Sequence, residues 1–311
     1  MTQNILITSI SSKTSLIQRV KDATKKYNKN MKVIGSDINP NVVGAYFTDN
    51  FWKMPKIKEL KPNEIIDYCK NNNIAYIIPT SDNDVVYFSK HKQKFLDKNI
   101  HVFVSEYQSV SFCFDKLKFY EDSGIDWCIK TSLSIKNITS DFYVLKERFG
   151  SGSRNIAIGV SKKEALKIVS TLHEAIFQPF IQGIEYSIDS YIDKSNNLIG
   201  SIIRSRDVVR DGESKVTTVV EDDILSKKVK KFLQKHKIQG HSVLQVIKRD
   251  KEYYLIECNA RFGGASTLSY ELGLESFYWF LQESNNQDIK ANISKKSLKQ
   301  VRCSKDIFFE N

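Results

Sequence analysis

The chain has 311 residues, which is more than one small hydrophobic core can organise, so two or three packed units are expected. Its composition, 41% hydrophobic and 27% charged, excludes wholesale disorder. The net charge of +11 comes from lysines spread along the chain, which favours solvated helix faces over a nucleic-acid track.

The apolar runs, the N-terminal stretch and the cysteines indicate in which cellular compartment the protein is expected. Each apolar run is only a few residues long, so no transmembrane helix is expected and no membrane partner. The N-terminus, MTQNILITSI, lacks a basic segment followed by an apolar one, so no export signal is expected. The cysteines are Cys69, Cys113, Cys128, Cys258 and Cys303, without a CxxC pair. They predict reduced thiols in a cytoplasmic protein rather than a disulfide framework or a zinc site.

The first hundred residues alternate short apolar strands with helical stretches. Strands are predicted over 4–10, 31–38, 74–80 and 100–105, and helices over 13–27, 61–73 and 82–99. This alternation predicts a parallel sheet with helices on both faces. The turn after the first strand, TSISSKTS, matches neither GxGxxG nor GxxxxGK[ST]. Its Ser and Thr residues are expected to cap the next helix, with anion binding as the alternative.

The pattern changes after about residue 110. The next predicted elements are a helix over 109–124, strands over 142–149 and 155–160, a helix over 161–174 and a strand over 175–181. Strands over 184–193 and 198–210 are expected to pair antiparallel across the turn KSNN. A helix over 221–237, a hairpin of strands 242–248 and 253–260, a helix over 266–284 and a final strand within KQVRCSKDIFF complete the chain. Ser161 and Glu164 form a capping box at the start of their helix.

The stretch ECNARFGG, residues 257–264, ends an apolar strand with polar residues at alternate positions. Strand side chains alternate between faces, so Glu257, Asn259 and Arg261 share one face if the strand extends that far. With RDKE as the turn, Gln245 is expected within about one residue of the position opposite Glu257. One carboxylate and two amide oxygens are hard ligands suited to Mg²⁺. An ordinary solvent-facing strand end is the alternative interpretation.

A loop of small residues follows Lys146 in VLKERFGSGSRN, residues 144–155. Small side chains at Gly150, Ser151, Gly152 and Ser153 let backbone N–H groups approach an anion closely. Lys146 lies on the strand that leads into the loop, where its ammonium could meet a phosphate. The alternative interpretation is a flexible hairpin tip with an exposed lysine.

The order of these pieces is more informative than any piece alone. Lys116 follows Asp115 at a helix start, Lys146 precedes the glycine loop, and FQPFIQGIEYSID places Glu185 just after a strand. In this order, and above all in YLIECNARFGG, the sequence resembles the ATP-grasp superfamily. The similarity is to the carboxylate–amine ligase branch, with carbamoyl-phosphate synthase large-subunit halves, biotin carboxylase and the pyrrolysine-pathway ligase. It covers essentially the whole chain, including IGSDINP and IIPTSDNDV.

The resemblance implies a fold that is α/β and α+β, with an N-terminal parallel-sheet pre-ATP-grasp domain followed by a two-subdomain ATP-grasp fold. The pre-ATP-grasp domain is expected over residues 1–108. The small, lid subdomain is expected over residues 109–182. The C-terminal subdomain, with the metal and substrate residues, is expected over residues 183–311. ATP would be clamped between the two subdomains together with Mg²⁺ or Mn²⁺.

The resemblance also assigns the nucleotide and metal contacts. The phosphates would meet Lys116, Lys146 and the loop of Gly150, Ser151, Gly152 and Ser153. The adenine would be lined by Gln178, Phe180 and Ile181, with Glu185 on the ribose. The metal would be held by Gln245, Glu257 and Asn259.

Two arginines are assigned to the reaction itself. The resemblance implies that Arg261 holds the carboxylate that attacks the γ-phosphate. Arg204, Arg206 and Arg210 alternate along one strand, and we rank Arg210 first as a phosphate contact because it precedes a DG turn. A structural salt bridge is the alternative role for these three. An acyl phosphate would form, and an amine would displace phosphate to give an amide.

Two positions depart from the family pattern and bear on the substrate. Pro179 replaces a frequent acid, so the hinge there would depend on backbone contacts. Gly264 stands where carbamoyl-phosphate synthase halves carry a second arginine, which favours a carboxylate larger than bicarbonate. The predicted enzyme joins a small carboxylate, such as an amino acid, to an amine, such as another amino acid or a nucleotide-linked amino sugar. The resemblance also admits a homodimer. The alternatives are a catalytically inactive ATP-binding regulator of the same fold and a ligase that uses a non-amine nucleophile.

Overall fold

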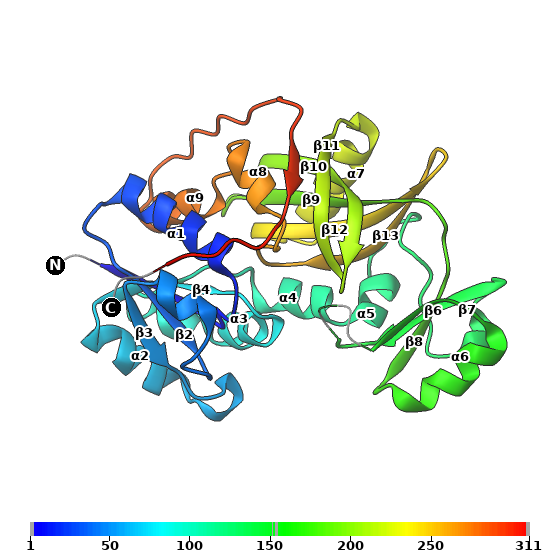
Figure 1. Ribbon diagram of the computed structural model, residues 1–311, viewed down its shortest axis with the longest axis horizontal. Helices are drawn as coiled ribbons and strands as arrows, with labels where there is room; N and C mark the ends of the chain where they lie inside the picture. The colour runs from blue at the N-terminus through cyan, green and yellow to red at the C-terminus, as the bar shows by residue number, and fades with distance from the viewer. Residues whose placement is uncertain (1–2, 151, 153–154, 309–311) are drawn as a thin grey trace.

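A computed structural model describes residues 3–150, 152 and 155–308. Its strands form three sheets (Figure 1), two at the ends of the long axis and the third between them. No helix among the described residues is long and apolar enough to span a membrane.

The first sheet is parallel and has the strand order β3-β2-β1-β4-β5. The strands are β1 (Asn4–Thr8), β2 (Val33–Asp37), β3 (Asn50–Lys53), β4 (Ile74–Pro79) and β5 (His101–Val102). The connections include the helices α1 (Thr14–Tyr27), α2 (Pro62–Asn71) and α3 (Asp82–Leu96) and the 3₁₀ turns η1 (Val43–Phe47) and η2 (Ile57–Glu59). The side chains of β1 from Ile5 to Ile7 are fully buried, as expected of a strand covered on both faces. The predicted parallel sheet is confirmed.

The second sheet is small and antiparallel, with the order β7-β6-β8. Its elements are β6 (Phe142–Glu147), β7 (Ile156–Ser161), α6 (Lys162–Ile168), the 3₁₀ turn η4 (Val169–Thr171) and β8 (Ala175–Pro179), with η3 (Ile135–Asn137) before them. The predicted capping box is present, because Ser161 and Glu164 exchange hydrogen bonds at the start of α6. The helix is shorter than predicted, since its last turn tightens into η4.

The third sheet has the strand order β13-β12-β9-β10-β11-β14, and each neighbouring pair of these strands is antiparallel. Its strands are β9 (Ile184–Ile192), β10 (Leu198–Arg210), β11 (Glu213–Val220), β12 (Gly240–Arg249), β13 (Glu252–Asn259) and β14 (Lys299–Val301). The helix α7 (Asp223–Lys235) packs its apolar residues into the core beside this sheet. The predicted pairing of β9 with β10 and the predicted hairpin of β12 and β13 are both confirmed. The strand β11 was not predicted from the sequence.

Two helices predicted as continuous are broken, and those predictions were wrong. The stretch 109–124 forms α4 (Tyr107–Phe114) and α5 (Lys116–Glu121). Asp115 separates them, because its ψ of 98° is not helical and its carboxylate caps α5. The stretch 266–284 forms α8 (Thr267–Glu271) and α9 (Ser276–Ser284). Gly273 separates these with a φ of +96°, and a Cβ there would lie 2.3 Å from the carbonyl oxygen of Asn292.

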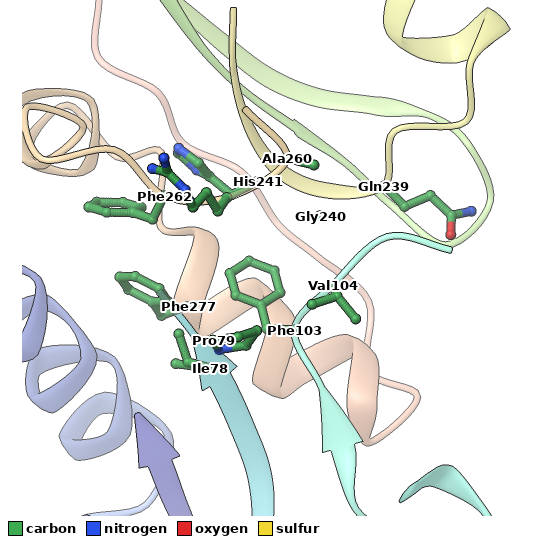
Figure 2. A pocket seen from close by; sticks show the side chains of 11 residues that line it. Ile78, Pro79, Phe103, Val104, Gln239, Gly240, His241, Ala260, Phe262 and Phe277 are labelled. Atoms are coloured by element: carbon green, nitrogen blue, oxygen red, sulfur yellow. The ribbon is translucent and has the colours of Figure 1, made fainter. Parts of the chain in front are cut away.

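The parallel sheet and the six-stranded sheet meet in a closely packed junction (Figure 2). The ends of β4 and β5 supply Ile78, Pro79 and Phe103, and His241 and Phe262 face them from the other sheet's side. The cavity left between them is about 10 Å³, which is room for at most one water molecule. Packing of this density fixes the segment after β13 against the carboxyl edge of the parallel sheet.

Candidate active site

A group of four charged side chains lies where the three-stranded sheet faces the six-stranded sheet. Lys146 on β6 is only 7% exposed. Burial lowers the pKa of Lys146 to about 8, the nearby Lys116 ammonium lowers it too, and the carboxylates of Glu257 and Glu185 oppose the shift. Two cations and two anions from separate parts of the chain are therefore within electrostatic reach of one another. We call this group the charge cluster.

The acidic side of the charge cluster begins on β13. Gln245 on β12 lies directly opposite Glu257, as the sequence predicted, and Ser187 of β9 lies on the other side of Gln245. The Nδ2 group of Asn259 donates a 3.0 Å hydrogen bond to Oε1 of Glu257. Burial alone would raise the pKa of Glu257, but Lys146 and Lys116 outweigh it and hold that pKa below its usual value. The carboxylate is therefore ionised at neutral pH.

Those oxygen donors fit a hard divalent cation better than a soft one. No group of three or more His, Cys, Asp or Glu side chains suited to a metal occurs within the described residues. A metal here would instead take one carboxylate from Glu257 and amide oxygens from Gln245 and Asn259. Mg²⁺ accepts such a set, because it draws its remaining ligands from water and phosphate.

The three arginines of β10 have different surroundings. The Nε group of Arg206 lies 3.0 Å from Oε1 of Glu185 in the charge cluster. Burial raises the pKa of Glu185, and Arg206 opposes that rise. Arg204 points into the core, where its Nε donates to Asp189 at 2.7 Å. Arg210 is exposed at the hairpin turn, where it pairs with Glu213 in the ladder. The phosphate contact of Arg210 stays a prediction, and Arg206, which was ranked below it, is the arginine of β10 that pairs with a member of the charge cluster.

The loop after β6 contacts the start of α5. Nζ of Lys116 donates to the carbonyl oxygen of Gly150. Arg148 binds both carboxylate oxygens of Asp115, at 2.7 and 2.6 Å, so the helix start and the loop are joined by a bidentate ion pair. Gly152 has a φ of +69°, which favours glycine. The other predicted members of this loop, Ser151 and Ser153, lie outside the described residues.

The three residues predicted to line the adenine lie at the end of β8 and just after it. The side chain of Gln178 is buried and donates a 2.9 Å hydrogen bond to the hydroxyl of Thr131. The backbone N–H of Phe180 donates to the carbonyl oxygen of Phe142, and Ile181 is partly exposed. The amide of Gln178 is thus already engaged, so an adenine contact there would come from the neighbouring residues or from the backbone.

Arg261 follows β13 and reaches the parallel sheet. Its Nε and Nη2 groups donate to the two carboxylate oxygens of Asp82 at 2.6 and 2.9 Å. Asp82 begins α3, directly after β4, and the strand order of the sheet reverses between β1 and β4. Ligands bind at such a reversal in open α/β sheets, so the position of Asp82 was a signal that the sequence analysis did not use. Nη1 of Arg261 takes no part in this pair.

The lowered pKa of Lys146 predicts a pH-dependent affinity for nucleotide. We expect the affinity for ADP, measured calorimetrically without divalent metal, to fall as pH rises through about 8, by at most about tenfold per pH unit. The reason is that a lysine with a lowered pKa loses its charge at a lower pH than its usual 10.5. Lys146→Arg stays charged and should flatten the profile. Parallel profiles in the two proteins would contradict this origin.

Comparison with known proteins bears on the family and the fold. Residues 5–103 match the family model described as PylC-like, N-terminal domain. Residues 171–307 match the model described as ATP-grasp in the biosynthetic pathway with Ter operon. No curated protein sequence matches the chain. The resemblance to the ATP-grasp superfamily that the sequence predicted is confirmed.

Solved structures with low sequence identity have the same fold. Biotin carboxylase from Campylobacter jejuni, solved as a β-γ-ATP complex, has a TM-score of 0.75 at 15% identity, covering 94% of this chain and 74% of that one. N5-carboxyaminoimidazole synthetase from Staphylococcus aureus, complexed with ADP, has a TM-score of 0.75 at 14% identity, covering 97% and 83%. L-amino acid ligase from Bacillus licheniformis has a TM-score of 0.68 at 14% identity, covering 91% and 74%. The chain has an ATP-grasp fold, and its N-terminal part is PylC-like.

Proposed function

We propose that this protein is an ATP-dependent carboxylate–amine ligase that forms an acyl phosphate and releases ADP and phosphate. The observation that carries the proposal is the charge cluster, in which Lys146 and Lys116 meet Glu257 and Glu185. Lys146 from the small sheet and Lys116 from α5, close to metal-type ligands from the large sheet, suit a nucleoside triphosphate with its cation. In this proposal residues 1–108, 109–182 and 183–311 act as three units, with ATP between the second and the third.

Each part of the cluster has a role in the proposal. Lys116 and Lys146 bind phosphate oxygens, the loop at Gly150 and Gly152 covers them, and Glu185 binds the ribose. Glu257, with Gln245 and Asn259, holds the cation, which supplies charge neutralisation at the phosphates. Arg206 is held by Glu185 at the same place. It is therefore a better candidate than Arg210 for a contact with the transferred phosphate.

The chemistry then requires positioning more than proton transfer. Arg261, held by Asp82, offers Nη1 to the substrate carboxylate. A carboxylate oxygen attacks the γ-phosphorus, the bond to the bridging oxygen breaks, and ADP leaves. The amine nitrogen next attacks the acyl carbon, phosphate leaves with the carbon–oxygen electron pair, and the amine proton passes to solvent. Orientation and electrostatic stabilisation account for most of the acceleration in such steps.

The similar structures support the nucleotide part of the proposal. One is a carboxylase domain with MgADP and bicarbonate, another is a synthetase with ADP, and a third is an L-amino acid ligase. These ligands are properties of those proteins. For this chain they make ATP and Mg²⁺ the first compounds to test, and amino acids the first carboxylates.

Phosphate release from ATP and Mg²⁺ tests the proposal directly. The panel consists of amino acids and other small carboxylates, each with and without an amine, including amino acids, UDP-linked amino sugars and hydroxylamine. We expect release that depends on one carboxylate and increases with an amine. If phosphate release increased when an alcohol was added with the carboxylate, and did not increase with any amine, the nucleophile in the proposal would be an alcohol. Tight ATP binding without release for any pair would favour a non-catalytic nucleotide-binding protein.

A further inference from the structure

The segment after β14 places an arginine against the loop that follows the predicted metal strand. A Cβ on Gly264 would lie 3.4 Å from both Nη1 and Nη2 of Arg302 and 3.6 Å from its Cζ. The guanidinium therefore lies directly over the backbone of Gly264. Gly264 does not have a positive φ. These distances are ordinary van der Waals contacts, so the guanidinium packs against this stretch of backbone without strain.

The loop itself lies next to the candidate site. A Cβ on Gly263 would lie 3.2 Å from a methyl group of Val243, and Val243 is directly opposite Asn259 in the sheet. The loop is held there because the backbone N–H of Gly263 donates to Ser266, whose hydroxyl donates to the buried Asp189. Arg302, although it is 43 residues beyond Asn259 by number, thus lies over the loop that follows the strand carrying Asn259.

Arg302 is held firmly but its charge is only partly compensated. Its backbone N–H donates to the carbonyl oxygen of Lys215 at 2.8 Å. Its Nη1 donates to Glu213 and to the carbonyl oxygen of Ser214, both at 3.3 Å. The same Glu213 carboxylate accepts a 2.7 Å hydrogen bond from Lys215. Two cations therefore share one anion.

The surroundings offer further hydrogen-bond donors. In the described part of the chain, no group accepts a hydrogen bond from the backbone N–H of Gly264 or of Ala265. The side chain of Arg302 is 26% exposed, so a ligand can reach the guanidinium without unfolding the segment. A half-compensated guanidinium beside unpaired backbone N–H groups is suited to a planar anion with two oxygens.

We propose that Arg302, with the backbone of Gly264, binds a carboxylate group of the substrate. The proposal rests on the proposed ligase function only in that it identifies the bound carboxylate as the substrate. Binding of the carboxylate can be measured without catalysis. The proposal gives a role in substrate specificity to the residue that directly follows β14. It also agrees with the structure at Arg261, two of whose guanidinium nitrogens are already bound by Asp82.

The test measures the melting temperature of the full chain against the concentration of acetate, malonate or L-glutamate, at constant ionic strength and with MgADP. We expect at least one carboxylate to stabilise the wild type, and Arg302→Gln to raise its half-saturating concentration about tenfold or more. Arg302→Lys should lie between them. Arg249→Gln, at an exposed ion pair on the β12–β13 hairpin, is the control and should match the wild type.

The melting temperature without ligand guards against a variant that simply folds badly, because Arg302→Gln is informative only where that temperature matches the wild type. Equal half-saturating concentrations in wild type and Arg302→Gln would overturn the proposal, and so would the absence of stabilisation by all three carboxylates. Stabilisation of the wild type by MgADP alone tests the proposed function separately. If MgADP did not stabilise the wild type, ATP use would be contradicted, but the comparison of carboxylates would still stand. Comparison of the three carboxylates distinguishes a simple carboxylate from an amino acid or a dicarboxylate.

Discussion

Glu257→Gln is expected to lower carboxylate-dependent phosphate release by about a hundredfold or more, with the fold retained. The change removes the charge of the one carboxylate that lies between Gln245 and Asn259, while keeping its size. It also removes the carboxylate whose charge does most to oppose the lowering of the Lys146 pKa. Loss of charge at a metal ligand weakens both the binding of the cation and the neutralisation of the transferred phosphate.

A second measurement separates the metal role from activity. In the wild type, Mg²⁺ should increase the stabilisation that ADP gives to the melting temperature, and in Glu257→Gln this increase should be lost. Glu252→Gln is the matched control, since it makes the same amide exchange at the exposed start of the same strand. Phosphate release near the wild-type rate in Glu257→Gln would remove Glu257 from the metal site.

The part of the site predicted from sequence is the part governed by local rules. Strand alternation and the short turn RDKE determine which residue of β12 faces Glu257, and the structure places Gln245 there. The glycine loop after Lys146 also follows from neighbouring residues. Local rules could have located the break at Asp115 as well, because Asp before a helical stretch is a strong N-cap signal that competes with a continuous helix.

The part that sequence did not predict depends on contacts between distant segments. Arg261 and Asp82 are 179 positions apart, and their pairing requires the parallel sheet to be docked against the end of β13. The surroundings of the three arginines of β10 were also hard to predict. Register shifts between Arg206 and Val208 and between Val208 and Val209 change which side chains share a face, so simple alternation does not extend to Arg210.

Asp189→Asn is expected to destabilise the fold by about 3–5 kcal/mol, because it leaves the charge of Arg204 buried without a partner. Asp189 is fully buried and accepts hydrogen bonds from Arg204 at 2.7 Å, from Ser269 at 2.6 Å and from Ser266. Nη1 of Arg204 already lacks a hydrogen-bond partner among the described residues, so its charge depends on the carboxylate of Asp189. Urea unfolding followed by tryptophan fluorescence and circular dichroism measures the difference.

The pH dependence of that difference follows from the sign of the pKa shift. Burial alone would raise the pKa of Asp189, but Arg204 and His241 hold it far below its usual 3.8. A carboxyl group with a lowered pKa stabilises the fold above its unfolded-state pKa and loses that contribution only as pH falls through the folded-state value. The difference in unfolding free energy between wild type and variant should therefore be equal at pH 7 and pH 9 and shrink only in acid.

Asp207→Asn, the same exchange at an exposed site on β10, should cost far less stability. An equally small cost for Asp189→Asn would show that Arg204 finds another partner. Because Ser266 connects Asp189 to the loop after Arg261, the variant should also bind carboxylates less well even under conditions where it is fully folded.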